Sequence, residues 1–193
     1  MLFNALLEHI FRQVQPHWVQ NKYGLKLGHT ELSIITGLRF ADDVLAISTS
    51  LTSLTAMLSD IERESRKQGL ELHPDKTKIM SNTSRRRGRT ASTTACVNTM
   101  QVEILPYSGV NKYLGRNVSF DKPHETEINA RVAAAWRKFM ANKDELTNAK
   151  YSLNRRLGLF ESIVGATMLY GCASWTLTKK LESQIQRTQR KML

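Results

Sequence analysis

The chain has 193 residues, enough for one ordinary domain or two small ones, and 41% of them are apolar, so a hydrophobic core is expected. Its 28 lysines and arginines exceed its 17 aspartates and glutamates and give a net charge of +11, which favours nucleic acid as a partner over a merely basic soluble surface. Cys96 and Cys172 stand too far apart in sequence for a zinc motif or a disulfide framework, so reduced thiols in an intracellular protein are expected. No apolar run approaches the roughly 20 residues of a membrane span, so no membrane partner is expected.

The first two segments are predicted to be a helix and a β-hairpin. Apolar residues recur at three- and four-residue spacings over residues 2–14, and this helical pattern ends before Pro16. The helix begins without a capping residue, from which we expect the chain to be a fragment. Residues 30–48 are predicted to form β structure, with a hairpin turn near Ala41, Asp42 and Asp43.

The next segments are a helix, two short strands and a loop. Residues 51–68 form an amphipathic pattern with Thr49 or Ser50 as N-cap and Gly69 as the stop. The stretch GLELHPDKTKIM, residues 69–80, predicts a strand, a Pro-Asp turn and a second strand. The small, polar and basic residues 81–95 predict a loop, which is either a flexible charged segment or a phosphate-binding one through Arg85, Arg86, Arg87 and Arg89.

Residues 96–120 alternate well enough for two or three strands, and the pattern becomes helical after Pro123. Trp136 and Trp175 fall among apolar residues, which favours core positions over base-stacking ones. The last predicted helix begins at Thr178, and its cations either follow a phosphate backbone or form an ordinary exposed face: Lys179, Lys180, Arg187, Arg190 and Lys191. The sequence therefore predicts an α+β chain whose β-rich part ends near residue 120 and is followed by a basic helical region.

The adjacent carboxylates of Asp42 and Asp43 interrupt an apolar, strand-forming run. Aspartate is common in turns, so the pair is either a solvent-facing turn or a metal site. Mg²⁺ prefers oxygen ligands and bridges carboxylates to substrate phosphates, and nucleotidyl transfer commonly uses two such ions. A tight turn would bring both side chains to one region, although a two-metal site usually needs a third carboxylate.

The order of the motifs resembles that of reverse transcriptases from non-long-terminal-repeat retrotransposons. Phe40-Ala41-Asp42-Asp43 resembles the active-site hairpin, and residues 2–8 resemble the end of the helix beneath the incoming nucleotide. Residues 51–80 resemble the following palm segment, with Lys76 in the place of a lysine that assists the leaving pyrophosphate. Tyr113-Leu114-Gly115 resembles the hairpin that grips the primer, and the helices after residue 123 resemble the thumb and connecting region.

The resemblance implies a partial polymerase palm over residues 1–120, an antiparallel sheet with packed helices, and an all-α thumb or connection region over residues 121–193. The implied activity is RNA-directed DNA synthesis with Mg²⁺ or Mn²⁺, an RNA template, a DNA primer and deoxynucleoside triphosphates, in the nucleus. The implied site residues are Asp42 and Asp43 for the metal, Lys76 as proton donor or charge stabiliser, Phe40 and Ala41 beneath the nucleotide or primer end, and Tyr113 and Gly115 on the primer. Lys76 is equally an ordinary turn lysine, and Tyr113 an ordinary strand residue.

One departure from the family pattern bears on activity. The upstream strand with the first catalytic aspartate, and the fingers before it, have no counterpart in this sequence. We therefore expect an incomplete active site that lacks the N-terminal polymerase half and is inactive alone. Two alternatives remain open: a non-catalytic nucleic-acid-binding remnant, and a basic interaction domain in which the aspartate pair is coincidental.

Overall fold

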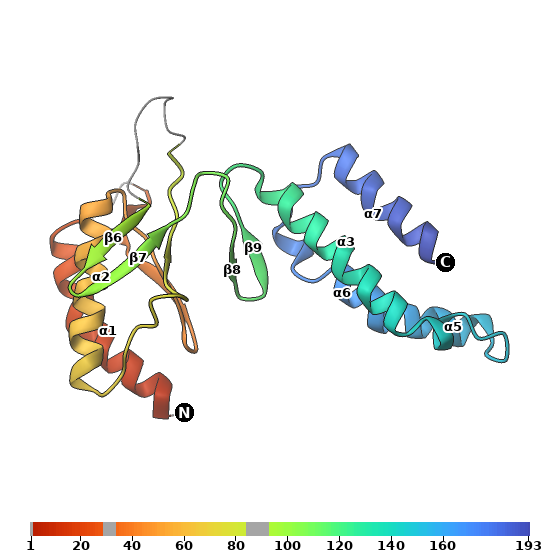
Figure 1. Ribbon diagram of the computed structural model, residues 1–193, viewed down its shortest axis with the longest axis horizontal. Coiled ribbons are helices and arrows are strands. Elements are labelled where there is room, and N and C mark those ends of the chain that lie inside the picture. The colour runs from red at the N-terminus through yellow and green to blue at the C-terminus, as the bar shows by residue number, and fades with distance from the viewer. Residues whose placement is uncertain (1, 29–33, 84–92) are drawn as a thin grey trace. The chain divides into compact units, whose positions relative to one another are not determined.

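The computed structural model describes residues 2–28, 34–83 and 93–193, and the chain forms two compact units that divide between Pro106 and Tyr107 (Figure 1). The predicted phosphate-binding residues Arg85, Arg86 and Arg87 lie outside the described residues. The mixture of helices and small sheets confirms the α+β class. The units divide earlier than the palm–thumb boundary expected at residues 120–121, and the assignment of palm and thumb remains a prediction.

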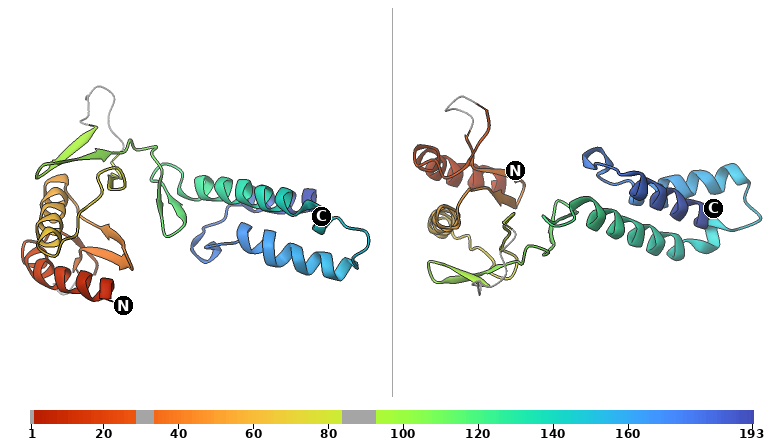
Figure 2. Two further views of the ribbon diagram at one scale, coloured as in Figure 1. Left: turned by 60° about the horizontal axis from the view of Figure 1, so that its bottom comes forward. Right: turned by 90° about the horizontal axis from the view of Figure 1, so that it is seen from above.

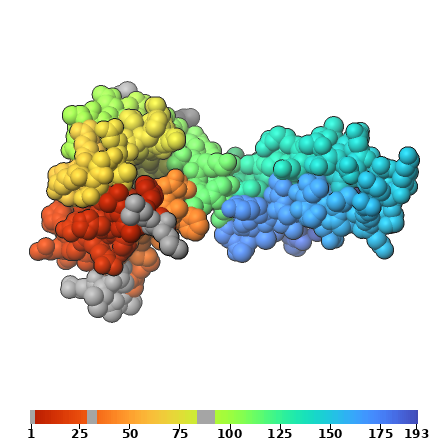
Figure 3. Space-filling model, turned by 90° about the horizontal axis from the view of Figure 1, so that it is seen from below, coloured from red at the N-terminus to blue at the C-terminus, as the bar shows by residue number. Residues whose placement is uncertain are grey.

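In the first unit, helices α1 (Leu2–Gln20) and α2 (Leu51–Lys67) lie side by side (Figure 3). The predicted caps of α2 are confirmed, since the Ser50 hydroxyl accepts from the Ser53 backbone N–H at 3.0 Å, and Gly69 follows the helix at a φ of +73°. The predicted end of α1 before Pro16 is wrong. Proline in a helix interior costs about 3 kcal/mol, but Trp18, two residues further on, is almost fully buried, and its packing holds the helix together.

The strands among the described residues of the first unit form three small sheets. Antiparallel pairs are made by β1 (Leu25–Lys26) with β2 (Ile34–Ile35), and by β3 (Gly37–Phe40) with β4 (Asp43–Ala46). The third sheet has the order β5-β7-β6, from Lys78–Ile79, Met100–Ile104 and Thr94–Val97, and β5 runs parallel to β7. The strand predicted before Pro74 does not form, because the backbone N–H of Leu70 bonds back to Ser65 at the end of α2.

Helix α2 contributes to both cores of this unit. One face packs on α1 in a cluster of Phe11, Val14, Trp18, Met57 and Ile61. A neighbouring side of α2 reaches the three-stranded sheet through Leu58, which belongs to a cluster of Leu58, Ile79, Ala95, Val97, Met100, Val102 and Ile104. The unit is therefore layered, with α2 between α1 and the β5-β7-β6 sheet (Figure 2).

The second unit joins a hairpin to a helical bundle. The hairpin comprises β8 (Asn111–Tyr113) and β9 (Arg116–Val118), and β9 packs on α3 (Pro123–Ala141). The remaining elements are α4 (Lys143–Leu146), α5 (Leu153–Phe160), the π-helical turn η1 (Glu161–Gly165), α6 (Ala166–Met168), the 3₁₀ turn η2 (Cys172–Ser174) and α7 (Lys179–Met192). The buried core of this bundle consists of Ala135, Phe139, Leu146, Phe160, Val164, Met168 and Met192.

The stretch Leu153–Ser174 corrects the expectation about membrane-length segments. It is the one stretch among the described residues with the length and apolar composition to cross a membrane, at a mean hydropathy of 1.3. Arg155, Arg156 and Glu161, together with small residues, interrupt the large apolar residues of this stretch, so the sequence contains no continuous apolar run here. Phe160, Val164 and Met168 are buried in the bundle core, which gives this stretch a packing role in the second unit.

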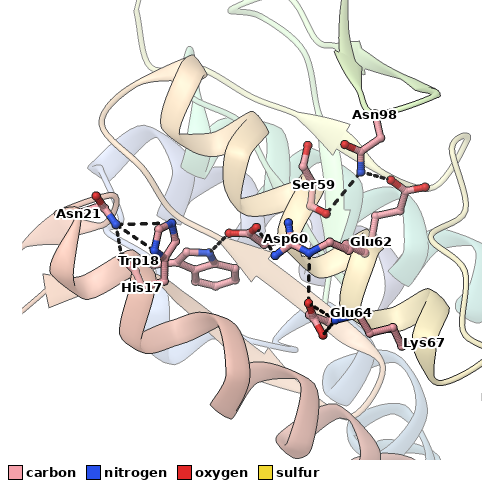
Figure 4. Close-up of polar contacts among 10 residues, drawn as sticks. His17, Trp18, Asn21, Ser59, Asp60, Glu62, Glu64, Lys67 and Asn98 are labelled. Atoms are coloured by element: carbon pink, nitrogen blue, oxygen red, sulfur yellow. Dashed lines mark hydrogen bonds and ion pairs between the residues drawn. The ribbon is translucent and has the colours of Figure 1, made fainter.

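The buried indole of Trp18 provides a test of the contact between α1 and α2. Its Nε1–H donates to Asp60 at 2.9 Å (Figure 4). The change Trp18→Phe removes this donor, and we expect the free energy of unfolding of the first unit to fall by about 1 to 2 kcal/mol in urea denaturation. The matched control is Trp175→Phe in the second unit, because the indole N–H of Trp175 is buried without a hydrogen-bond partner among the described residues. Equal losses from the two changes would contradict this account.

Candidate active site

The aspartate pair lies at a two-residue turn between β3 and β4. The strands pair from Gly37 with Ala46 to Phe40 with Asp43, which leaves Ala41 and Asp42 as the turn. Ala41 has a φ of +52°, a left-handed conformation that a two-residue hairpin commonly requires but that costs a non-glycine residue about 1 kcal/mol. Asp42 therefore projects from the turn itself and Asp43 opens β4, and both are exposed.

The two faces of this hairpin have different surroundings. Side chains alternate along each strand and paired residues share a face. Arg39, Val44 and Ala46 share the inner face, where Val44 and Ala46 pack on the α1–α2 cluster. The outer face carries Asp43 among three exposed apolar side chains: Leu38 (52% exposed), Phe40 (67%) and Leu45 (38%). Asp43 is thus on an open, largely apolar surface.

Arg39 anchors the hairpin to α1. Its guanidinium carbon lies 4.5 Å from the centre of the Phe11 ring, and its Nη1 lies 3.0 Å from Glu8 Oε2. A hydrogen bond from Arg12 and the charge of Arg39 lower the pKa of Glu8 below its ordinary value. Glu8 therefore stays ionised at neutral pH and holds Arg39 against α1, which fixes the strand that leads into the turn.

The predicted catalytic residues have no ion-pair partner in the described part of the chain. Asp42, Asp43 and Lys76 are all exposed, and Lys76 lies in the turn after Pro74, where its backbone N–H bonds to the His73 carbonyl. No group of three or more His, Cys, Asp or Glu side chains in the described residues is arranged to hold a metal ion. The site that these residues offer is therefore one pair of free carboxylates.

In the second unit, Tyr113, Leu114 and Gly115 are at the tip of the β8–β9 hairpin. Leu114 and Gly115 have φ values of +48° and +75°, as in a type I′ turn. The carbonyl oxygens of both turn residues are bonded: Tyr170 Oη donates to that of Leu114 at 3.2 Å, and Arg131 Nη2 donates to that of Gly115. The tip is thus tied to α3 and to the chain after α6.

A buried carboxylate beneath this hairpin was missed by the sequence analysis. Glu127 on α3 is fully buried and accepts from the Asn117 backbone N–H and from Arg131 Nε, both at 2.7 Å. The guanidinium carbon of Arg131 also lies 4.6 Å from the centre of the Tyr170 ring. The sequence signal is an oppositely charged pair four residues apart on a predicted helix, but the same spacing is common on exposed faces.

The reverse transcriptase (RNA-dependent DNA polymerase) family model matches residues 1–118, a span that contains the aspartate turn, Lys76 and the tip of the β8–β9 hairpin. The chain belongs to the reverse transcriptase family. An uncharacterized transposon-derived protein of Caenorhabditis elegans is 30% identical over 157 residues, which cover 80% of this chain and 53% of that protein. The chain thus spans about half the length of this relative. No solved structure matches the chain.

The family match places the aspartate hairpin within a reverse transcriptase segment, whereas the α3–α7 bundle lies beyond the matched residues. Phe40, Ala41, Tyr113 and Gly115 also fall inside the match. Their contacts with nucleic acid or nucleotide remain predictions, as do the metal ligands and the role of Lys76.

Gly115 tests how tightly the hairpin tip is constrained. The change Gly115→Ala would put a Cβ at a φ of +75° and 3.4 Å from Tyr170 Oη, so we expect the second unit to lose about 1 to 2 kcal/mol of unfolding free energy. The control is Gly158→Ala on α5, where an added Cβ meets nothing within 4 Å and should stabilise the helix by about 0.5 to 1 kcal/mol. Opposite signs in thermal or urea denaturation are expected; a neutral Gly115→Ala would mean that the tip is free to rearrange.

Proposed function

We propose that this chain is the active-site segment of an RNA-directed DNA polymerase from a non-long-terminal-repeat retrotransposon. The observation that carries the proposal is the pair of exposed carboxylates, Asp42 and Asp43, at a hairpin turn whose strands pack on the α1–α2 cluster inside the region that matches the family. The transposon-derived relative supports a mobile-element origin. The substrates proposed are an RNA template, a DNA primer end and deoxynucleoside triphosphates.

The donor set at the turn fits Mg²⁺ or Mn²⁺. Mg²⁺ keeps several waters and is commonly bound through one or two carboxylates plus substrate phosphates, so two exposed aspartates without ion-pair partners would suffice to hold one ion. Such ions, when bound, promote attack by a primer hydroxyl and stabilise the leaving pyrophosphate. Asp42 and Asp43 would hold the ion at the turn, and the packing of Arg39 and Val44 would keep the turn in place.

The other predicted residues take supporting roles in this proposal. Phe40, exposed on the outer face beside Asp43, and Ala41 in the turn would form the surface beneath the nucleotide or primer end. Lys76 would donate a proton or a positive charge to the leaving pyrophosphate. Tyr113 and Gly115, on a hairpin tip whose carbonyls are tied to α3 and Tyr170, would position the primer. Residues 1–120 would correspond to the palm and residues 121–193 to the thumb or connection.

Metal binding tests the role of the turn directly. With Mn²⁺ as the probe, we expect paramagnetic broadening of NMR amide signals from Ala41 to Val44. The double change Asp42→Asn with Asp43→Asn should weaken Mn²⁺ binding by about tenfold or more, because both anionic ligands are lost. The control is the double change Asp121→Asn with Asp144→Asn, two exposed aspartates outside the site. Broadening that survives at the turn in the first variant would refute a metal site there.

Primer extension tests whether the described residues suffice for catalysis. Because they offer two carboxylates and no third ligand in the same cluster, we expect this chain alone to give no extension on an RNA template with Mg²⁺ or Mn²⁺. A longer polypeptide that contains the chain and supplies the third carboxylate should extend the primer, and Asp42→Asn within it should abolish the reaction. Sustained extension by the chain alone would show that two carboxylates are enough.

A second candidate is a nucleic-acid-binding protein without catalysis. The excess of 28 basic over 17 acidic residues favours it, since phosphate contacts supply most non-specific affinity. If the protein only binds nucleic acid, Asp42 and Asp43 would contribute nothing to the affinity. Lysines and arginines elsewhere in the chain would then provide the contacts with phosphate. Arg85, Arg86 and Arg87 remain predicted contacts.

A further inference from the structure

An open basic groove, which the proposed polymerase site does not use, lies along α7 beside α3. The groove has a volume of about 670 Å³ and is lined by Trp136, Lys179, Lys180, Ser183, Gln184, Arg187, Thr188 and Lys191. Four of these eight residues are cations and none is acidic. The groove lies entirely within the second unit and beyond the residues that match the reverse transcriptase family.

The two helices run in the same direction (Figure 2), and two side-chain contacts between them give their register. Lys180 Nζ lies 3.7 Å from Glu125 Oε1, and one turn further along both helices Gln184 donates to Asn129 at 2.8 Å. Continuing this register brings Trp136 level with Lys191. The groove therefore has cations along its α7 wall and a half-buried indole on its α3 wall.

The α7 wall is one continuous helical stripe. Lys179, Ser183, Arg187 and Lys191 follow each other at intervals of four residues, which correspond to about 6 Å along a helix axis. Lys180 is partly neutralised by Glu125, but Lys179, Arg187 and Lys191 form no ion pair with any described residue and are exposed. Three unneutralised charges thus lie in a row of about 18 Å along one wall.

We propose that this groove binds a single strand of nucleic acid, with phosphates along the α7 stripe and a base against Trp136. A row of free cations matches an anionic partner with repeated charges, which a polynucleotide backbone supplies. The indole favours a single strand over a duplex, because a base can stack on an aromatic side chain only when it is unpaired. RNA and DNA share this chemistry. The proposal does not depend on metal binding by Asp42 and Asp43.

Salt-dependent binding of the full chain tests the charge stripe. The probe is a fluorescein-labelled, uridine-rich RNA of about 12 nucleotides, a length within the range that such grooves bind, with the matching DNA strand and the duplex as further probes. The triple change Lys179→Gln, Arg187→Gln, Lys191→Gln should make the slope of log affinity against log salt shallower by roughly 2, since each lost contact removes about 0.7. The control triple Lys138→Gln, Lys150→Gln, Arg190→Gln removes the same charge from exposed residues outside the groove and should change the slope little.

Trp136 is tested by substitution and by cross-linking. Trp136→Ala should weaken single-strand binding roughly 5- to 100-fold and Trp136→Phe much less, because stacking depends on an aromatic face. Trp136 also packs edge-on against Phe139, so loss of the bundle is checked by circular dichroism. Ultraviolet cross-linking of the unchanged protein to a 5-bromouridine strand needs no substitution, so it cannot be affected by unfolding of a variant. It should label the peptide that contains Trp136.

Three outcomes would overturn the proposal. These are equal effects of the groove and control triples, duplex binding as tight as single-strand binding, and cross-links confined to peptides outside α3 and α7. Asp42 and Asp43 are unchanged in every variant, so any of these outcomes would leave the metal-site proposal intact. Conversely, a finding that the turn binds no Mn²⁺ would leave the groove proposal intact.

Discussion

The contact between α1 and α2 is the constraint on which the candidate active site depends. The β3–β4 hairpin is only two strands wide and pairs with no other strand among the described residues, and a hairpin of this size is marginally stable by itself. It is held because its inner face lies on the cluster that the two helices create, against which Val44 and Ala46 pack. Loss of the α1–α2 contact would therefore release the aspartate turn even though neither helix carries a predicted catalytic residue.

The second hairpin is fixed by polar contacts instead of an apolar face. Glu127 is buried without exposure to water, a costly position for a carboxylate unless donors surround it. Arg131 and the Asn117 backbone N–H provide those donors, and Arg131 extends the network to the Gly115 carbonyl. Such a network tolerates substitution poorly, because removal of one partner leaves the other charge buried. The tip of β8–β9 is thus held in one geometry, as a primer-positioning element would need.

Features set by local chemistry could be predicted from the sequence, and features set by distant partners could not. The N-cap Ser50, the stop at Gly69 and the hairpin turn at Ala41 and Asp42 each depend on a few adjacent residues, and all three are present. The continuation of α1 past Pro16 depends on the burial of Trp18 against α2. Helix α2 is distant in the sequence, so the residues around Pro16 alone do not reveal this contact. The parallel pairing of β5 with β7 joins segments that the sequence separates by a polar loop.

The same division applies to the candidate sites. The aspartate pair is visible as an anomaly within an apolar run, whereas Glu127 looks like any charged residue on a helix until the hairpin above it is known. The basic stripe of α7 was visible, but whether it faced a groove or open solvent depended on the register with α3. Trp136 was expected in the core, and it is half-buried there while also lining the groove, so one residue serves both descriptions.

The exposure of the aspartate turn determines how strongly the site would respond to metal. Like charges on neighbouring side chains repel weakly in water, and the repulsion grows severalfold at the lower effective dielectric of a covered surface. In the described structure Asp43 shares an open face with Leu38, Phe40 and Leu45, so the repulsion is screened and the apolar side chains remain in water. Covering that face would bury the apolar area favourably but would also bring the two carboxylates into a less polar environment. A divalent cation removes that penalty, so metal binding at Asp42 and Asp43 and coverage of the outer face of the hairpin would favour each other.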